Sequence, residues 1–135
     1  MAKKIFINLP VADLQKSMTF YTAIGFTNNP QFTDETAACM VLTDEIYVML
    51  LSHPKFKEFT KKEIGNTFKS ASVINSLSVD SVDEVNAIAD KSLKAGGKET
   101  NEPKDYGFMQ QRSFEDLDGH LWEVLYMDVT KFPTE

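Results

Sequence analysis

The sequence predicts an α+β fold assembled from two copies of a β-α-β-β-β module. The first observation is a repeat, because a strand-like segment followed by a helix-like segment begins near residue 4 and again near residue 72. The second is that each helix-like segment ends at glycine, a common helix stop. The third is composition: 135 residues, 42% hydrophobic and 25% charged, are typical of one soluble globular domain. We expect a single domain, with module one at about 4–52, a linker helix at about 53–70 and module two at about 71–127.

Module one begins with residues 4–11, KIFINLPV, whose β-branched and aromatic residues predict a strand. Pro10 cannot donate a backbone hydrogen bond, so this strand ends there or lies at a sheet edge. Residues 12–26 predict a helix with Asp13 as its N-cap and Gly25 as its stop. Three further segments read as strands: 26–32, 36–42 and 46–51.

Module two follows the same order. Residues 72–79, SVINSLSV, predict a strand, and residues 80–97 predict a helix that ends at Gly96 and Gly97. The second helix should be about one turn longer than the first, since more residues separate its preceding strand from its glycine stop. Further strands are expected at 108–114 and 120–126.

The linker, residues 53–69, carries apolar residues at roughly helical spacing and is the most basic part of the chain. We expect a helix packed on the sheets. Its lysines have two interpretations: the solvated face of that helix, or a lid that attracts an anionic ligand. We place none of them in the candidate site.

Charge and composition exclude several classes of partner. The formal charge of −6 and pI near 4.9 argue against nucleic acid and anionic membranes, which bind positive surfaces. Cys39 is the single cysteine and cannot form an internal disulfide; flanked by apolar residues, it is expected to be buried rather than nucleophilic. The first residues contain too short an apolar run for a signal peptide or a membrane span. We expect a cytoplasmic protein.

Two sequence stretches carry a resemblance to a known family. The opening INLPVADLQKSMTFYTAIGF and the close FEDLDGHLWEVLY, together with the repeated module, resemble the vicinal oxygen chelate superfamily. Its members include glyoxalase I-like lyases, extradiol dioxygenases, fosfomycin-resistance transferases and bleomycin-resistance proteins. The resemblance implies an open barrel of the glyoxalase/bleomycin-resistance type, in which the paired modules enclose a ligand cavity. It also implies a homodimer.

The resemblance further implies four metal-ligand positions, on the first and last strands of each module. In this sequence they fall on Phe6, Met49, Ile74 and Glu123, and only the last is a family-type ligand. Period-two alternation adds Asn8 to the face of Phe6, and Ser76 and Ser78 to the face of Ile74, as weak oxygen donors. His53 and His120 lie in turns and are expected to be surface or capping residues. We therefore expect no metal cofactor, with an atypical divalent metal as the alternative.

Glu123 lies in the middle of an apolar strand. Surrounded by apolar side chains it would be desolvated, and its pKa would rise toward that of a general acid or base. Gln110, Arg112 or Asn8 would then stabilise an oxyanion. The structural interpretation is that Ser78, Arg112 or a backbone amide satisfies the carboxylate.

Arg112 is also open to two interpretations, a cavity residue that binds an anionic group or a surface residue paired with Glu115. Phe6 and Phe108 are the candidates for stacking on a planar ligand. The candidate ligand-binding set is Phe6, Asn8, Met49, Ile74, Ser76, Phe108, Arg112 and Glu123.

Three functions fit these observations. The sequence favours a small-molecule-binding protein of the bleomycin-resistance kind, with an apolar cavity that lacks most metal ligands. The alternative is a glyoxalase- or dioxygenase-like enzyme (a lyase, isomerase or dioxygenase), either metal-free through Glu123 or with an atypical divalent metal. A protein-interaction module without a small ligand is the third.

Overall fold

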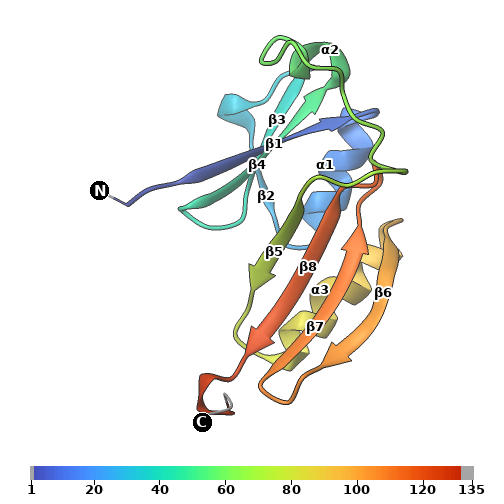
Figure 1. Ribbon diagram of the computed structural model, residues 1–135. Coiled ribbons are helices and arrows are strands. Elements are labelled where there is room, and N and C mark those ends of the chain that lie inside the picture. The colour runs from blue at the N-terminus through green and yellow to red at the C-terminus, as the bar shows by residue number, and fades with distance from the viewer. Residues whose placement is uncertain (1, 132–135) are drawn as a thin grey trace. The chain divides into compact units, whose positions relative to one another are not determined.

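A computed structural model describes residues 2–131 and resolves them into two compact units that divide between Ser70 and Ala71. Each unit is one β-α-β-β-β module with a four-stranded mixed sheet and its own helix (Figure 1). The α+β class and the duplicated module are therefore confirmed. The helix of the second module is 13 residues long against 10 in the first, as the sequence predicts.

In module one the main elements are β1 (Ile5–Val11), α1 (Leu14–Ala23), β2 (Thr27–Asn29), β3 (Ala37–Val41) and β4 (Ile46–Ser52). The sheet order is β1-β4-β3-β2, with β1 parallel to β4 and the other pairs antiparallel. A 3₁₀ turn, η1 (Pro30–Phe32), joins β2 to β3, and the one-turn helix α2 (His53–Phe56) follows β4.

The core of module one lies between α1 and the sheet. Asp13 caps α1 by accepting a hydrogen bond from the amide of Lys16 at 3.1 Å. Phe20 and Tyr21 of the helix are fully buried, as are Val48 and Leu50 of β4. Each such apolar side chain contributes about 1.5–3 kcal/mol when withdrawn from water, so this layer holds the helix on the sheet.

In module two the elements are β5 (Ile74–Ser78), α3 (Val82–Lys94), β6 (Lys98–Asp105), β7 (Met109–Glu115), β8 (Leu121–Met127) and the 3₁₀ turn η2 (Val129–Lys131). The sheet order is β5-β8-β7-β6, again with the first pair parallel and the others antiparallel.

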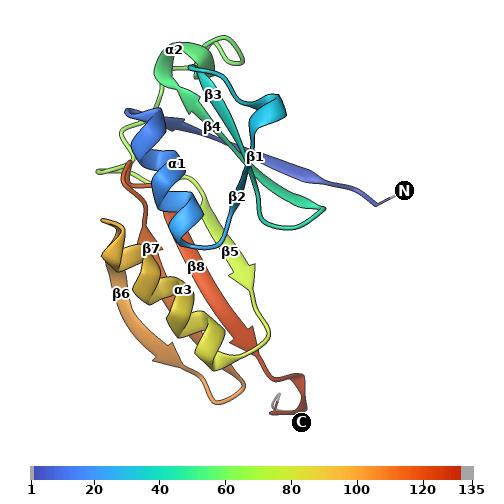
Figure 2. The ribbon, with the colours of Figure 1, turned by 180° about the vertical axis from the view of Figure 1, so that it is seen from behind.

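The helix α3 covers one face of its sheet, where it lies across β7 and β8 (Figure 2). Val85 and Ala89 of α3 are buried together with Phe114, Trp122 and Val124 of these strands. Ser81 caps the helix by accepting a hydrogen bond from the amide of Glu84 at 3.1 Å. The alternation of buried and half-exposed residues along β8 leaves the other face of the sheet to polar and smaller apolar side chains.

The predicted linker helix over 53–70 is wrong beyond its first turn, because α2 ends at Phe56. Local side-chain hydrogen bonds replace helical ones: Thr60 accepts from the amide of Lys62, and Asn66 from the amide of Phe68, each at 3.1 Å. The predicted strand over 26–32 is also too long, since Pro30 begins η1.

The strand β6 was not among the predicted elements. Its sequence, KETNEPKD, has no apolar alternation, because it is an exposed edge strand that carries charges and a proline. Within residues 2–131 no helix is both long and apolar enough to cross a membrane.

Candidate functional site

In module one the predicted ligand positions lie on the sheet face that points away from α1. Asn8 of β1 pairs with Met49 of β4, and Phe6 lies two residues before Asn8, so all three share this face. Phe6 is 50% exposed and stacks on Tyr47, with ring centroids 4.4 Å apart and the planes 14° from parallel. Asn8 donates a hydrogen bond to the carbonyl of Phe6 at 3.1 Å. The face therefore presents an aromatic platform and a thioether.

In module two the corresponding face carries Glu123 at its centre. Ser76 of β5 is the register partner of Glu123, and its hydroxyl donates to Oε1 of the carboxylate at 2.8 Å. The amide Nε2 of Gln111, on β7, donates to Oε2 at 2.6 Å. The structure thus brings together two predicted residues, Ser76 and Glu123, and adds Gln111, which the sequence analysis did not select.

Each oxygen of the Glu123 carboxylate therefore receives one neutral donor from a neighbouring strand. A carboxylate has about four acceptor positions, so this one is fixed in orientation and keeps acceptor capacity for a further donor. The side chain is half-buried. Leu121 and Leu125 flank it on the same face of β8, and Ile74 of β5 is 55% exposed beside Ser76. The site is one oriented carboxylate, held by the polar side chains of Ser76 and Gln111 and flanked by apolar ones.

Arg112 does not share this face. Alternation along β7 sends it to the α3 side, where its guanidinium binds Asp90 at 2.8 Å and Glu99 at 3.1 Å. Nη1 of Arg112 also donates to Oδ1 of Asn86 at 3.3 Å. Burial disfavours the charged form, but the hydrogen bonds with Asp90 and Glu99 outweigh it and raise the pKa of Arg112 above its usual value.

Two sequence-based interpretations are corrected by this placement. Arg112 pairs with Asp90 and Glu99 rather than with Glu115, and it does not satisfy the carboxylate of Glu123. Gln110 also lies on the α3 side, where its amide donates to Asp105 at 3.0 Å. Neither Arg112 nor Gln110 therefore lies beside Glu123 to bind an oxyanion.

Phe108 precedes β7, in the turn after β6, and its carbonyl accepts from the amide of Asp128 at 2.7 Å. Its part in stacking on a ligand stays a prediction.

The donor atoms at the family-type metal positions do not fit a transition metal. Phe6 and Ile74 carry no ligating atom, Met49 offers only a thioether, and Glu123 is the single carboxylate. Within residues 2–131 no group of three or more His, Cys, Asp or Glu is arranged to hold a metal ion. His53 is exposed. His120, expected to be a surface or capping residue, is buried in the turn before β8, where its backbone amide donates to Asp116 at 2.9 Å.

The fold and the site define a paired-module protein of the glyoxalase class, and comparison with known sequences agrees. Residues 5–124 match the Glyoxalase/Bleomycin resistance protein/Dioxygenase superfamily. The chain belongs to this superfamily. No curated protein matches it.

Solved structures share the fold over nearly the whole chain. The hypothetical protein SA1046 from S. aureus is 28% identical with a TM-score of 0.78, over 93% of this chain and 94% of that one. A glyoxalase/bleomycin resistance protein/dioxygenase family enzyme from Burkholderia phytofirmans PsJN has a TM-score of 0.78 at 14% identity, over 93% and 99% of the two chains. The fosfomycin resistance protein FosX from Listeria monocytogenes has a TM-score of 0.66 at 17% identity, over 100% and 94%. At identities this low the last two establish the fold alone.

Proposed function

We propose that this chain is a small-molecule-binding protein of the glyoxalase/bleomycin-resistance kind, whose binding face is apolar and lacks most of the metal ligands. The observation that carries the proposal is the replacement of ligating side chains at exposed positions. Phe6 and Ile74 are 50% and 55% exposed on the faces that point away from the helices. Large apolar side chains left in water are costly, and a ligand that covers them recovers that free energy.

The oriented carboxylate sets a preference among ligands. With Ser76 and Gln111 holding its two oxygens, Glu123 is an acceptor with fixed direction. A ligand with an apolar body and a hydroxyl, amide or amine donor fits such a face better than an anion does. We propose a ligand of that kind, bound without a metal cofactor.

A homodimer is part of the proposal. Exposed aromatic and aliphatic side chains on a soluble acidic chain commonly mark association surfaces, and symmetric dimers are the commonest oligomers.

The second candidate function is a metal-free lyase or isomerase, and the position of Glu123 is the observation that favours it. A half-buried carboxylate held by two neutral donors is oriented well enough to accept a proton from carbon next to a carbonyl. In that case Glu123→Gln would abolish turnover while ligand binding persisted. If Glu123→Gln instead loses ligand binding, and the wild-type protein shows no detectable turnover, the first function is favoured.

The experiment is a thermal-shift screen of small apolar compounds, with and without donor groups, followed by variants of the face. Phe6→Lys places a charge on the face of module one and Ile74→Lys on the face of module two, each at a position that is half exposed, so folding should persist. Phe32→Lys is the matched control, because Phe32 is 63% exposed in η1 and outside the proposed face.

We expect a stabilising compound to lose its effect in the variant of the module face that binds it, and to keep it in the control. An equal loss in the control, or no stabilising compound at all, would contradict the proposal.

A further inference from the structure

The two oxygens of the Glu123 carboxylate are held from opposite sides of β8. Ser76 of β5 donates to Oε1 at 2.8 Å, and Gln111 of β7 donates to Oε2 at 2.6 Å. Among the residues that the structure describes, no other donor reaches this carboxylate. Because one donor comes from each side, each oxygen keeps an acceptor position, and the two positions left are neighbours.

The amide of Gln111 can be oriented in only one way. A carboxylate only accepts hydrogen bonds, so the nitrogen of Gln111 must face Glu123 and its oxygen, Oε1, must point elsewhere. No donor from residues 2–131 reaches this Oε1. The hydroxyl of Ser76 likewise uses its single proton on Glu123. The three side chains therefore satisfy one another and leave mainly acceptors for a ligand.

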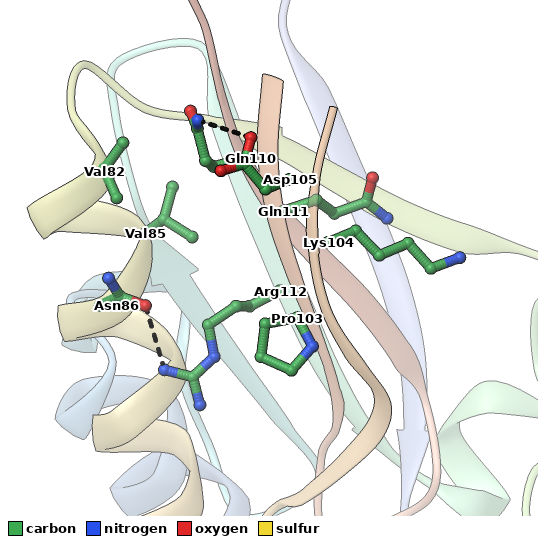
Figure 3. Close-up of a pocket in the computed structure, with 9 residues that line it drawn as sticks. All are labelled: Val82, Val85, Asn86, Pro103, Lys104, Asp105, Gln110, Gln111 and Arg112. Carbon is green, nitrogen blue, oxygen red and sulfur yellow. Dashed lines mark hydrogen bonds between the residues drawn. The ribbon is translucent and has the colours of Figure 1, made fainter. Parts of the chain in front are cut away.

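The charge of Glu123 is not isolated on this face. Lys104 of β6 is the register partner of Gln111, and Figure 3 shows both side chains directed away from α3, whereas Arg112 reaches the helix. A lysine two strands away partly offsets the carboxylate, so the face does not favour a cation over a neutral molecule. An anion would meet a carboxylate and further acceptors. Selection therefore depends on the number and direction of the ligand's donors.

We infer that Glu123, with Ser76 and Gln111, selects a neutral ligand whose apolar body carries two parallel N–H bonds, as a substituted urea does. The inference rests on the proposed small-molecule-binding function and names the chemical class of its ligand. Two parallel N–H bonds match the two oxygens of one carboxylate, as in arginine–carboxylate pairs. The apolar body lies over Ile74, which is 55% exposed two residues before Ser76. Gln111 is a positioning residue, because it acts through Glu123.

The test is a titration of the full-length protein with phenylurea, followed by ¹⁵N NMR. N-Methyl-N-phenylurea is the matched compound, because it keeps the ring and replaces one N–H bond of the pair with a methyl group. The reporter is the side-chain amide signal of Gln111, and that of Gln110, on the α3 side, is the internal control.

We expect saturable shifts of the Gln111 signal with phenylurea and none of the Gln110 signal. The dissociation constant should be on the order of 1 mM, as ligand efficiency allows for about ten non-hydrogen atoms. The methylated compound should bind about tenfold more weakly, because it loses one hydrogen bond to a charged group.

Variants test the positioning role. Gln111→Met keeps the length of the side chain but releases Oε2, and should reduce the tenfold preference for phenylurea to about twofold. A merely structural loss would weaken both compounds equally and leave the preference unchanged. Ser76→Ala, at an exposed position, releases Oε1 and should reduce the preference in the same way. Gln110→Met is the matched control on the other side of β7, and should change neither affinity.

Three results would overturn the inference and leave the proposed function standing. They are equal binding of the two ureas, an unchanged preference in both Gln111→Met and Ser76→Ala, and tighter binding of benzylammonium than of phenylurea, which would show that charge alone is recognised. Failure of the proposed function looks different, because then neither these compounds nor any other apolar compound would bind, and the inference would fall with it.

Discussion

Arg112 offers the sharpest test of how module two is assembled. Its side chain is only 12% exposed and joins three elements, since Asp90 belongs to α3, Glu99 to β6 and Arg112 itself to β7. Replacement by methionine keeps much of the apolar stem but removes the three hydrogen bonds of the guanidinium.

The loss of unfolding free energy expected for Arg112→Met follows from the exposure of the partners of Arg112. Asp90 is 62% exposed, so its pair with Arg112 contributes about 0.5 kcal/mol, whereas Glu99 is 31% exposed and contributes about 1 kcal/mol. The bond to Asn86 adds about 0.5 kcal/mol. Arg112→Met should therefore lower the free energy of unfolding by about 2 kcal/mol and Tm by about 6 °C.

The assay is urea unfolding followed by circular dichroism, with Lys55→Met as the matched control. Lys55 makes an exposed i,i+3 pair with Glu58 at 3.5 Å, and its loss should cost less than about 0.5 kcal/mol. Arg112→Lys keeps the charge but not the planar fork, and should lose about 1 kcal/mol. If Arg112→Met were no worse than the control, the guanidinium would not join α3 to the sheet, and our assignment of the two sheet faces would be refuted.

Three further outcomes are expected. The amide and hydroxyl of Thr36 hold the pKa of Asp34 below its usual value, so this carboxylate stabilises the fold above about pH 4. The Tm difference between wild type and Asp34→Asn should therefore vanish as the pH falls through the folded pKa. Gly96→Ala should lower the free energy of unfolding by about 2 kcal/mol in the same urea assay, because φ is +107° and the added Cβ would lie 2.9 Å from a leucine methyl. Gly25→Ala has a positive φ but open space around the added Cβ, and should cost about 1 kcal/mol. Burial raises the pKa of the Cys39 thiol, so a thiol reagent should label it only after unfolding, and labelling of the native protein would contradict its placement in the core.

Elements with a clear hydrophobic period were predictable from the sequence. Both helices had glycine stops and the first had an N-cap at Asp13, and the structure places the helices where those signals lie. The strand β6 was not predictable in this way, because its residues face solvent and need no apolar period. The linker 53–70 misled the prediction because spaced phenylalanines imitate a helix face, although Phe59 and Phe68 are 70% and 67% exposed.

The candidate site was predictable only in part. Alternation placed Ser76 on the face of Ile74, and the family resemblance placed Ile74 and Glu123 together. The side chains of Ser76 and Glu123 do meet. Gln111 required the register between β7 and β8, in which Ser113 stands opposite Glu123, and no local pattern fixes that register. Arg112 is the neighbour of Gln111 on β7, and neighbours in a strand point to opposite sides. An error of one residue in the register was therefore enough to make Arg112 a candidate partner of Glu123.

The central claim is that this member of the superfamily binds its ligand without a metal, and metal analysis of the purified wild-type protein tests it most directly. The protein would be assayed for bound metal and for a change in Tm on adding Mn, Fe, Co, Ni or Zn. We predict far less than one equivalent of any of them and no metal-specific rise in Tm. A stoichiometric metal would contradict the account. So would a saturable rise in Tm on adding one metal; a ligand at 100 times its Kd stabilises the folded state by roughly 2.7 kcal/mol.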